Sequence, residues 1–136
     1  MVFFASGFLS LIHMKVILSI KPEFASKIFE GSKKYEFRRV IFKNTDVKTV
    51  VVYASSPIQK VIGEFEIEHI LKNNLSALWK ETKNDSGITE NYFYDYFGDK
   101  ESGFAIKIKS TKKYKRPKCI REDFHLFPPQ SFLYLD

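Results

Sequence analysis

The stretch that decides the expected fold reads Gly31-Ser32-Lys33-Lys34-Tyr35-Glu36-Phe37-Arg38-Arg39. Its last seven residues hold four cations and one carboxylate. The pattern predicts a strand over 33–42, and successive residues of a strand point to opposite faces. One face would hold Lys34, Glu36 and Arg38, and the other would send Tyr35 and Phe37 into the core.

Two interpretations of this stretch follow from its chemistry. Glu36 beside Arg38 would keep the carboxylate ionised and the guanidinium aimed, and an oriented guanidinium recognises phosphate or the edge of a base. The alternative is an ion pair on the surface, which would contribute less than ~1 kcal/mol.

Periodicity outward from this stretch predicts a chain that alternates short strands with few helices. A strand over 15–20 precedes a helix that starts at Pro22 and ends at Gly31, where a left-handed cap belongs. Further strands are expected over 47–54, 61–70, 104–109 and 131–135, and a helix over 75–83. Thr89 is expected to be the N-cap of another helix, whose apolar stripe of Phe93, Tyr96 and Phe97 would lie in the core. Gly63, on the inward face of its strand, suits a bulge or a close backbone approach. Residues 111–117 are expected to form a basic loop.

This element order indicates the α+β class. Five or six short strands with two or three short helices favour a small mixed or antiparallel sheet, closed or half-closed into a barrel. The length of 136 residues suits one domain.

The single cysteine, Cys119, predicts a reducing compartment and therefore the cytoplasm, because it has no partner for an internal disulfide. The three histidines are scattered, so we expect no metal site and no cofactor. Residues 1–13 are apolar, lack Lys and Arg, and are too short to span a membrane. We therefore expect no membrane partner, a natural start at Met14, and a domain over 14–136.

The positive charge of the chain gathers in one late segment. Lys107–Arg121 contains eight basic residues and no acidic one, although the whole chain carries only +6. Such a segment attracts polyanions, but a solvated strand and loop would look the same. We expect a nucleic-acid backbone to lie along Lys112, Lys113, Tyr114, Lys115, Arg116 and Lys118, with Tyr114 stacking a base. Alternatively, Lys107 and Lys109 pair across the sheet with Glu64, Glu66 and Glu68.

The spacing Gly31-x-Lys33-x-x-Glu36-x-Arg38 resembles the signature of ASCH domains. The flanking Ser19-Ile-Lys-Pro22, Val52-Tyr-Ala-Ser-Ser-Pro57 and Val61-Ile-Gly63 segments strengthen the resemblance, and Pro128-Pro-Gln-Ser-Phe132 resembles the end of a prokaryotic subgroup of predicted transcriptional regulators. The resemblance implies a PUA-like β-barrel that binds RNA, modified nucleotides or, alternatively, DNA in a cleft. Its cleft residues would be Ser19, Lys21, Lys33, Glu36 and Arg38.

The same resemblance leaves an enzyme open as the alternative. In ASCH amidohydrolases that act on acetylated cytidine, a threonine stands at the position of Glu36, and a lysine at that of Lys33 acts as base. A carboxylate replaces an acyl-accepting hydroxyl poorly. Another branch is ribonuclease-like, and there Glu36 could act as base while cations stabilise the phosphate charge. Lys33 and Glu36 would be the catalytic residues in either case. A third hypothesis is a regulatory partner protein that docks through its aromatic helix.

Overall fold

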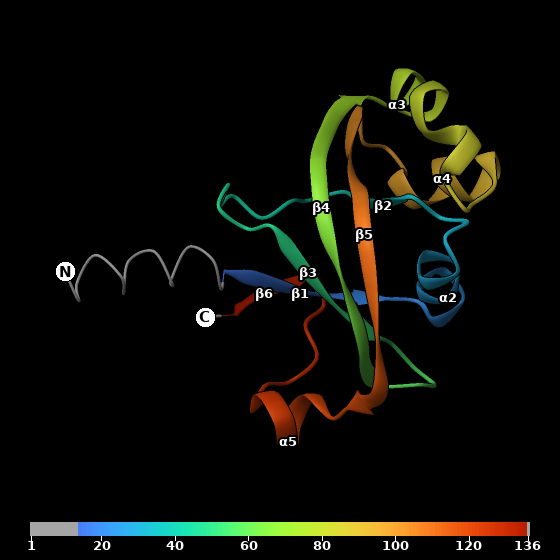
Figure 1. Ribbon diagram of the computed structural model, residues 1–136. Coiled ribbons are helices and arrows are strands. Elements are labelled where there is room, and N and C mark those ends of the chain that lie inside the picture. The colour runs from blue at the N-terminus through green and yellow to red at the C-terminus, as the bar shows by residue number, and fades with distance from the viewer. Residues whose placement is uncertain (1–13, 136) are drawn as a thin grey trace.

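The computed structural model describes residues 14–135, so the predicted N-terminal extension over 1–13 lies outside the described residues. The described chain runs as an alternation of strands and short helices (Figure 1). Its elements are β1 (Lys15–Ile20), α2 (Pro22–Glu30), β2 (Tyr35–Arg38), β3 (Thr49–Ala54), β4 (Lys60–Asn74), α3 (Leu75–Thr82), α4 (Glu90–Phe97), β5 (Ser102–Lys118), α5 (Ile120–Phe124) and β6 (Phe132–Leu135). The α+β class is confirmed, with four helices in place of the two or three expected.

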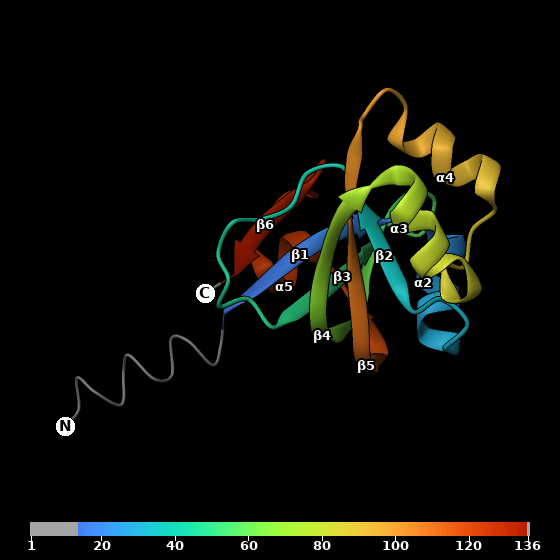
Figure 2. The same cartoon turned by 90° about the horizontal axis from the view of Figure 1, so that it is seen from above.

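Across residues 14–135, six strands form one sheet in the order β2-β5-β4-β3-β1-β6. β1 and β3 are parallel, and the other neighbours are antiparallel. Within the described residues β2 and β6 are the two edges and do not pair, so the predicted closure into a barrel is wrong. The sheet is long and curved instead, and β4 and β5 extend well past their neighbours (Figures 1 and 2).

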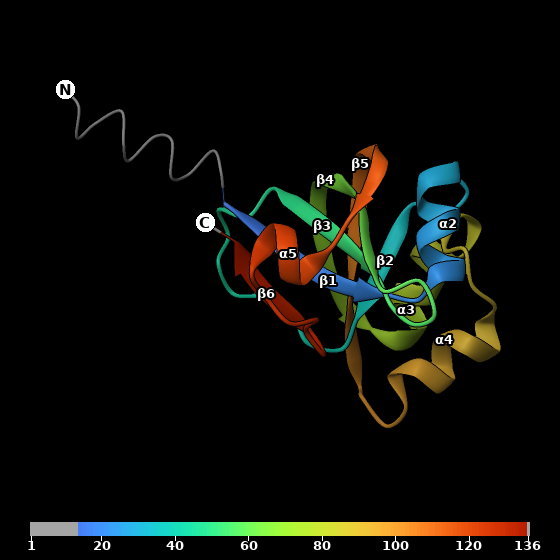
Figure 3. The same cartoon turned by 90° about the horizontal axis from the view of Figure 1, so that it is seen from below.

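The centre of the sheet is covered on both faces. One face of β1 and β3 packs with Ala25 and Ile28 of α2. The other face packs with Ile120 of α5, which lies across β1 and β3 in Figure 3. β1 therefore buries apolar residues on both sides, with Val16 and Leu18 on one and Ile17 on the other.

Two predictions about β4 and β5 have different outcomes. The register between the strands shifts at Gly63, and a β-carbon there would lie 2.6 Å from the Phe29 ring and 2.7 Å from the Lys112 carbonyl oxygen, so the expected bulge and close approach are confirmed. The basic loop over 111–117 is wrong, because these residues continue β5 to Lys118. Their backbone pairs with β4, which keeps the segment extended.

Two helices, α3 and α4, cover the upper part of the sheet in Figure 1. They pack Leu78, Phe93 and Phe97 against Phe37 of β2, so the predicted core stripe of α4 is confirmed for Phe93 and Phe97, whereas Tyr96 is only half-buried. The Thr89 hydroxyl accepts a hydrogen bond from the Tyr92 amide at 3.1 Å, which confirms the predicted N-cap. Among residues 14–135, no helix has the length and apolar character needed to cross a bilayer.

Candidate functional site

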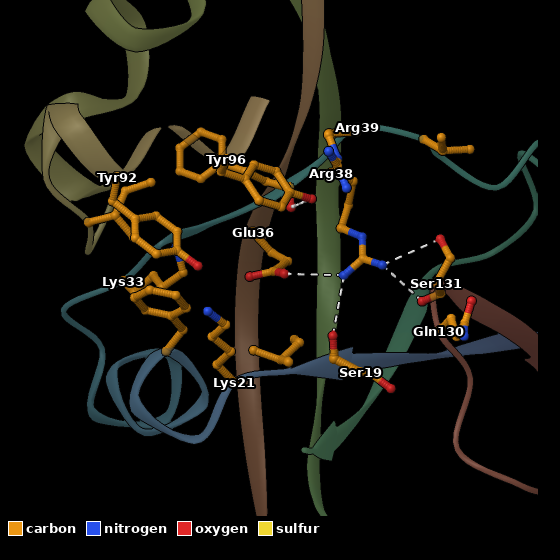
Figure 4. A pocket seen from close by; sticks show the side chains of 15 residues that line it. Ser19, Lys21, Lys33, Glu36, Arg38, Arg39, Tyr92, Tyr96, Gln130 and Ser131 are labelled. Carbon is orange, nitrogen blue, oxygen red and sulfur yellow. Dashed lines mark hydrogen bonds and ion pairs between the residues drawn. The ribbon is translucent and has the colours of Figure 1, made fainter. Parts of the chain in front are cut away.

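A pocket of about 510 Å³ opens between the end of β1, the start of α2, β2, α4 and the segment before β6 (Figure 4). Its size falls in the range of small-ligand sites. Every residue predicted to bind a ligand lines it: Ser19, Lys21, Lys33, Glu36 and Arg38. The structure therefore brings together residues that lie up to 19 positions apart along the chain.

Lys33 lies at the deep end of the pocket and is 2% exposed. Its Nζ donates a hydrogen bond to the Ser86 carbonyl oxygen at 2.7 Å. The same nitrogen lies 5.3 Å from the centre of the Phe24 ring and 5.0 Å from that of Phe37. Burial lowers the pKa of Lys33 to about 8, against the attraction of Glu36, because water does not solvate the ammonium there.

Glu36 and Arg38 converge as predicted and do not splay apart. The Arg38 Nη1 lies 3.5 Å from the Glu36 Oε2, and both side chains are buried. Burial raises the pKa of the Glu36 carboxyl, while Lys33 and Arg38 pull it down. The surface ion pair considered as the alternative is therefore wrong, because the pair lies inside a pocket.

Arg38 is held from three sides. Its Nη2 donates to the Ser131 carbonyl oxygen at 2.9 Å and to the Ser131 Oγ at 3.5 Å, and its Nη1 donates to the Ser19 carbonyl oxygen at 3.4 Å (Figure 4). These bonds join β2 to β1 and to the segment before β6, where the sheet has no ladder within residues 14–135. Arg38 thus replaces backbone pairing with a side-chain bridge.

Two cation–tyrosine pairs form another part of the lining. Lys21 Nζ lies 5.4 Å from the Tyr92 ring centre, and the Arg39 guanidinium carbon lies 5.4 Å from the Tyr96 ring centre. Tyr92 and Tyr96 are four residues apart on α4, so they occupy the same face of the helix. The Tyr96 hydroxyl donates to the Phe37 carbonyl oxygen at 3.1 Å, which fixes its ring.

Sequence reasoning missed several lining residues, and it placed Tyr96 in the core. The missed residues include Arg39, Tyr96, Gln130 and Ser131. The spacing of the two tyrosines on α4 was the available signal, whereas nothing local connects Ser131 to Arg38. The Ser19 hydroxyl donates a hydrogen bond to the Pro129 carbonyl oxygen at 2.5 Å. Ser19 therefore contacts Arg38 through its backbone carbonyl oxygen and not through its hydroxyl.

The basic residues of β5 lie outside the pocket lining. Lys112, Lys113, Lys115, Arg116 and Lys118 are exposed. The Tyr114 hydroxyl donates to Glu64 at 2.8 Å, and Lys118 covers its ring at 4.7 Å. The cross-strand alternative is confirmed for Lys107, whose Nζ lies 3.2 Å from a Glu68 carboxylate oxygen.

Comparison with known proteins shows which family this chain belongs to. Residues 13–126 match the family described as "Domain of unknown function (DUF365)". A protein of Zymomonas mobilis named "ASCH domain-containing ribonuclease" is 30% identical over 126 residues, which are 89% of this chain and 84% of that protein. This chain belongs to the ASCH domain family. The crystal structure of the ASCH protein from Zymomonas mobilis superposes with a TM-score of 0.82 at 29% identity and covers 90% of this chain and 87% of that one.

Two other matches lie within much longer proteins of Ureaplasma parvum. A large ribosomal subunit protein uL22 is 31% identical over 124 residues, and an ATP synthase subunit alpha is 31% identical over 121 residues. The chain spans only 39% and 15% of their respective lengths. None of the relatives named here supports the expected subgroup of transcriptional regulators.

Proposed function

We propose that this protein binds single-stranded RNA and that the pocket takes up one nucleotide of it. The observation that carries the proposal is the burial of Lys33, Glu36 and Arg38 in one cavity of about 510 Å³. Buried charged groups cost solvation energy, and they cluster at functional sites. The named activity of the Zymomonas relative favours RNA as the ligand.

The chemistry of the lining matches a nucleotide. Glu36 supplies a hydrogen-bond acceptor and Lys33 a donor, and the edge of a base offers the complementary groups. Tyr92 and Tyr96 supply aromatic surface, while Lys21 and Arg39 supply charge for phosphate. A base enters such a pocket only when it is unpaired, which favours a single strand over a duplex.

The exposed cations of β5 would hold the RNA backbone. Lys112, Lys113, Lys115 and Arg116 add positive charge to one extended strand. Stacking by Tyr114 stays a prediction, because its hydroxyl and one ring face already have partners. Each engaged phosphate adds about 0.7 to the slope of log affinity against log salt for a single strand.

A binding experiment tests the pocket. Labelled single-stranded RNA and the same sequence as a duplex are titrated with wild-type protein, Glu36→Gln and Lys33→Ala. We expect tighter binding of the single strand and a loss of at least tenfold in each variant. Lys80→Ala and Glu81→Gln, two exposed residues of α3, serve as matched controls. Equal binding by pocket variants and controls would remove the pocket from the proposal.

Ribonuclease activity is the second candidate function. The name of the Zymomonas relative favours it, and so does a buried lysine with a pKa of about 8, because a general acid or base works best near the ambient pH. Cleavage requires a group that takes the proton of the attacking oxygen and cations that stabilise the phosphate as its bond to the leaving oxygen breaks. Glu36 or neutral Lys33 could take the proton.

The cleavage assay follows RNA length over time with and without added divalent cations. We expect cleavage by the wild-type protein that disappears in Glu36→Gln and Lys33→Ala while both variants keep their fold. RNA that stays intact with every protein would remove this candidate and leave binding alone. Incubation with an acylated nucleoside tests the amidohydrolase alternative in the same series.

A further inference from the structure

We propose that the turn over 85–87 is a positioning element of the site, and that Gly87 is the residue that allows Lys33 to point into the pocket. The inference rests on the proposed function for the importance of Lys33, but the placement of Lys33 can be measured without RNA. The turn lies more than 50 residues after Lys33 in the sequence.

Three hydrogen bonds join the turn to the segment that follows α2. The Lys33 Nζ donates to the Ser86 carbonyl oxygen at 2.7 Å, and the backbone amide of Lys34 donates to the Asp85 carbonyl oxygen at 2.8 Å. From α2, the Lys27 Nζ donates to the Gly87 carbonyl oxygen at 3.1 Å. Three successive carbonyl groups of one turn thus accept from residues around the deep end of the pocket.

Gly87 meets two requirements at once. Its φ of +70° is a backbone conformation that favours glycine. A β-carbon at this position would lie 2.6 Å from both the Cβ and the Cγ of Lys33. Those atoms belong to the base of the side chain and cannot move aside as freely as its tip, so any larger residue would push Lys33 away from the Ser86 carbonyl group.

The neighbours of Lys33 explain how such a displacement would be seen. Glu36 of β2 and Lys27 of α2 are the charged groups that act on it most, and Phe24 and Phe37 cover its ammonium. Burial dominates and keeps the pKa of Lys33 at about 8. A displaced side chain would regain water, and the pKa of Lys33 would rise toward its ordinary value.

The experiment is a pH titration of the lysine Cε signals by NMR in wild-type protein, Gly87→Ala and Gly98→Ala. Gly98 is the matched control, because its φ is also positive at +61° but a β-carbon there meets no atom within 4 Å. We expect Lys33 to titrate near pH 8 in the wild type and in Gly98→Ala, and at higher pH in Gly87→Ala. Identical titration of Lys33 in the two glycine variants would overturn the proposal.

A second variant covers the case in which Gly87→Ala fails to fold. The Ser86 hydroxyl hydrogen-bonds within its own turn to Lys83 and Ile88, so Ser86→Ala loosens the turn without adding an atom. The pKa of Lys33 should rise there too, and an unchanged value would count against the proposal. RNA binding is measured in parallel: a wild-type protein that does not bind RNA contradicts the proposed function, whereas the titration judges the turn by itself.

Discussion

Arg38 contributes more to the structure of the pocket than its position in a short motif suggests. Its guanidinium contacts Ser19, Ser131 and Glu36, so its donors are largely used by the protein. We therefore assign it to holding Glu36 and the walls of the pocket. A planar fork makes these bonds and a lysine cannot.

Arg38→Lys should lower the free energy of unfolding by about 2–3 kcal/mol, because buried hydrogen bonds to a charged group are lost. Urea denaturation measures it. Arg39→Lys is the control, since Arg39 is exposed and its variant should unfold within about 0.5 kcal/mol of the wild type. An equal loss of unfolding free energy in Arg38→Lys and Arg39→Lys would contradict the bridging role of Arg38.

The burial of the Lys33 ammonium lowers the stability of the folded protein. Its pKa is about 8 in the folded protein and near 10.5 when unfolded, so the folded state binds fewer protons between these values. The free energy of unfolding therefore rises as the pH rises from about 8 to 10.5, because the folded state loses the buried charge. Below pH 8 Lys33 is charged in both states, and the full cost of burying the ammonium applies.

Lys33→Met should accordingly be more stable than the wild type at pH 7, by up to about 3 kcal/mol. The gain should shrink as the pH rises to 10.5. Urea denaturation at several pH values measures both effects, with exposed Lys34→Met as the control. A variant less stable than the wild type at pH 7 would mean that Lys33 stabilises the fold. Stability gained as RNA binding is lost would identify Lys33 as a functional residue.

At the scale of elements, α4 joins the core to the pocket. Phe93 and Phe97 pack inward, while Tyr92 and Tyr96 line the pocket. The helix has two turns and begins at the Thr89 cap, so the position of its tyrosines depends on that cap.

Thr89→Ala should cost about 1 kcal/mol of stability, because the Tyr92 amide loses its acceptor. It should also weaken RNA binding, since Tyr92 lies in the first turn of the helix. Thr89→Ser keeps the hydroxyl and should behave like the wild type in thermal denaturation and in binding. If Thr89→Ser is as weakened as Thr89→Ala, the cap is not the cause.

At the scale of the whole molecule, the positive charge is concentrated on one exposed strand and the pocket is separate from it. The net charge of +6 arises from Lys107–Arg121, which forms most of β5 and the start of α5. Long-range attraction and specific recognition would then be performed by different parts of the surface.

Replacing Lys112, Lys113, Lys115 and Arg116 by Gln should lower the salt dependence of RNA binding, with a loss of up to about 3 in the log–log slope. The control replaces Lys43, Lys48, Lys80 and Lys100, which are exposed elsewhere, and has the same net charge. Fluorescence anisotropy over a series of salt concentrations measures the slopes. Equal slopes for the two variants would mean that net charge, and not β5, determines binding.

The sequence alone predicted most of the local elements and the residues at the centre of the site, but it missed α5 and the second half of β5. Alternation, Pro22, Gly31 and Thr89 fix strands, helix ends and caps through interactions between residues close in the chain. The resemblance of the motif to the ASCH signature implied that Lys33, Glu36 and Arg38 share a cleft, whereas strand alternation by itself placed only Glu36 and Arg38 of these three on one face.

Only the tertiary structure decided the rest. The sheet stays open because its edge strands β2 and β6 do not pair within the described residues, and packing across the whole molecule sets which strands pair. Arg38 contacts Ser131, which lies 93 positions away in the chain. Lys33 contacts Ser86 of the 85–87 turn, which lies 53 positions away. No local sequence pattern encodes contacts over such separations. The burial of Lys33, and with it the lowered pKa, follows from those distant contacts.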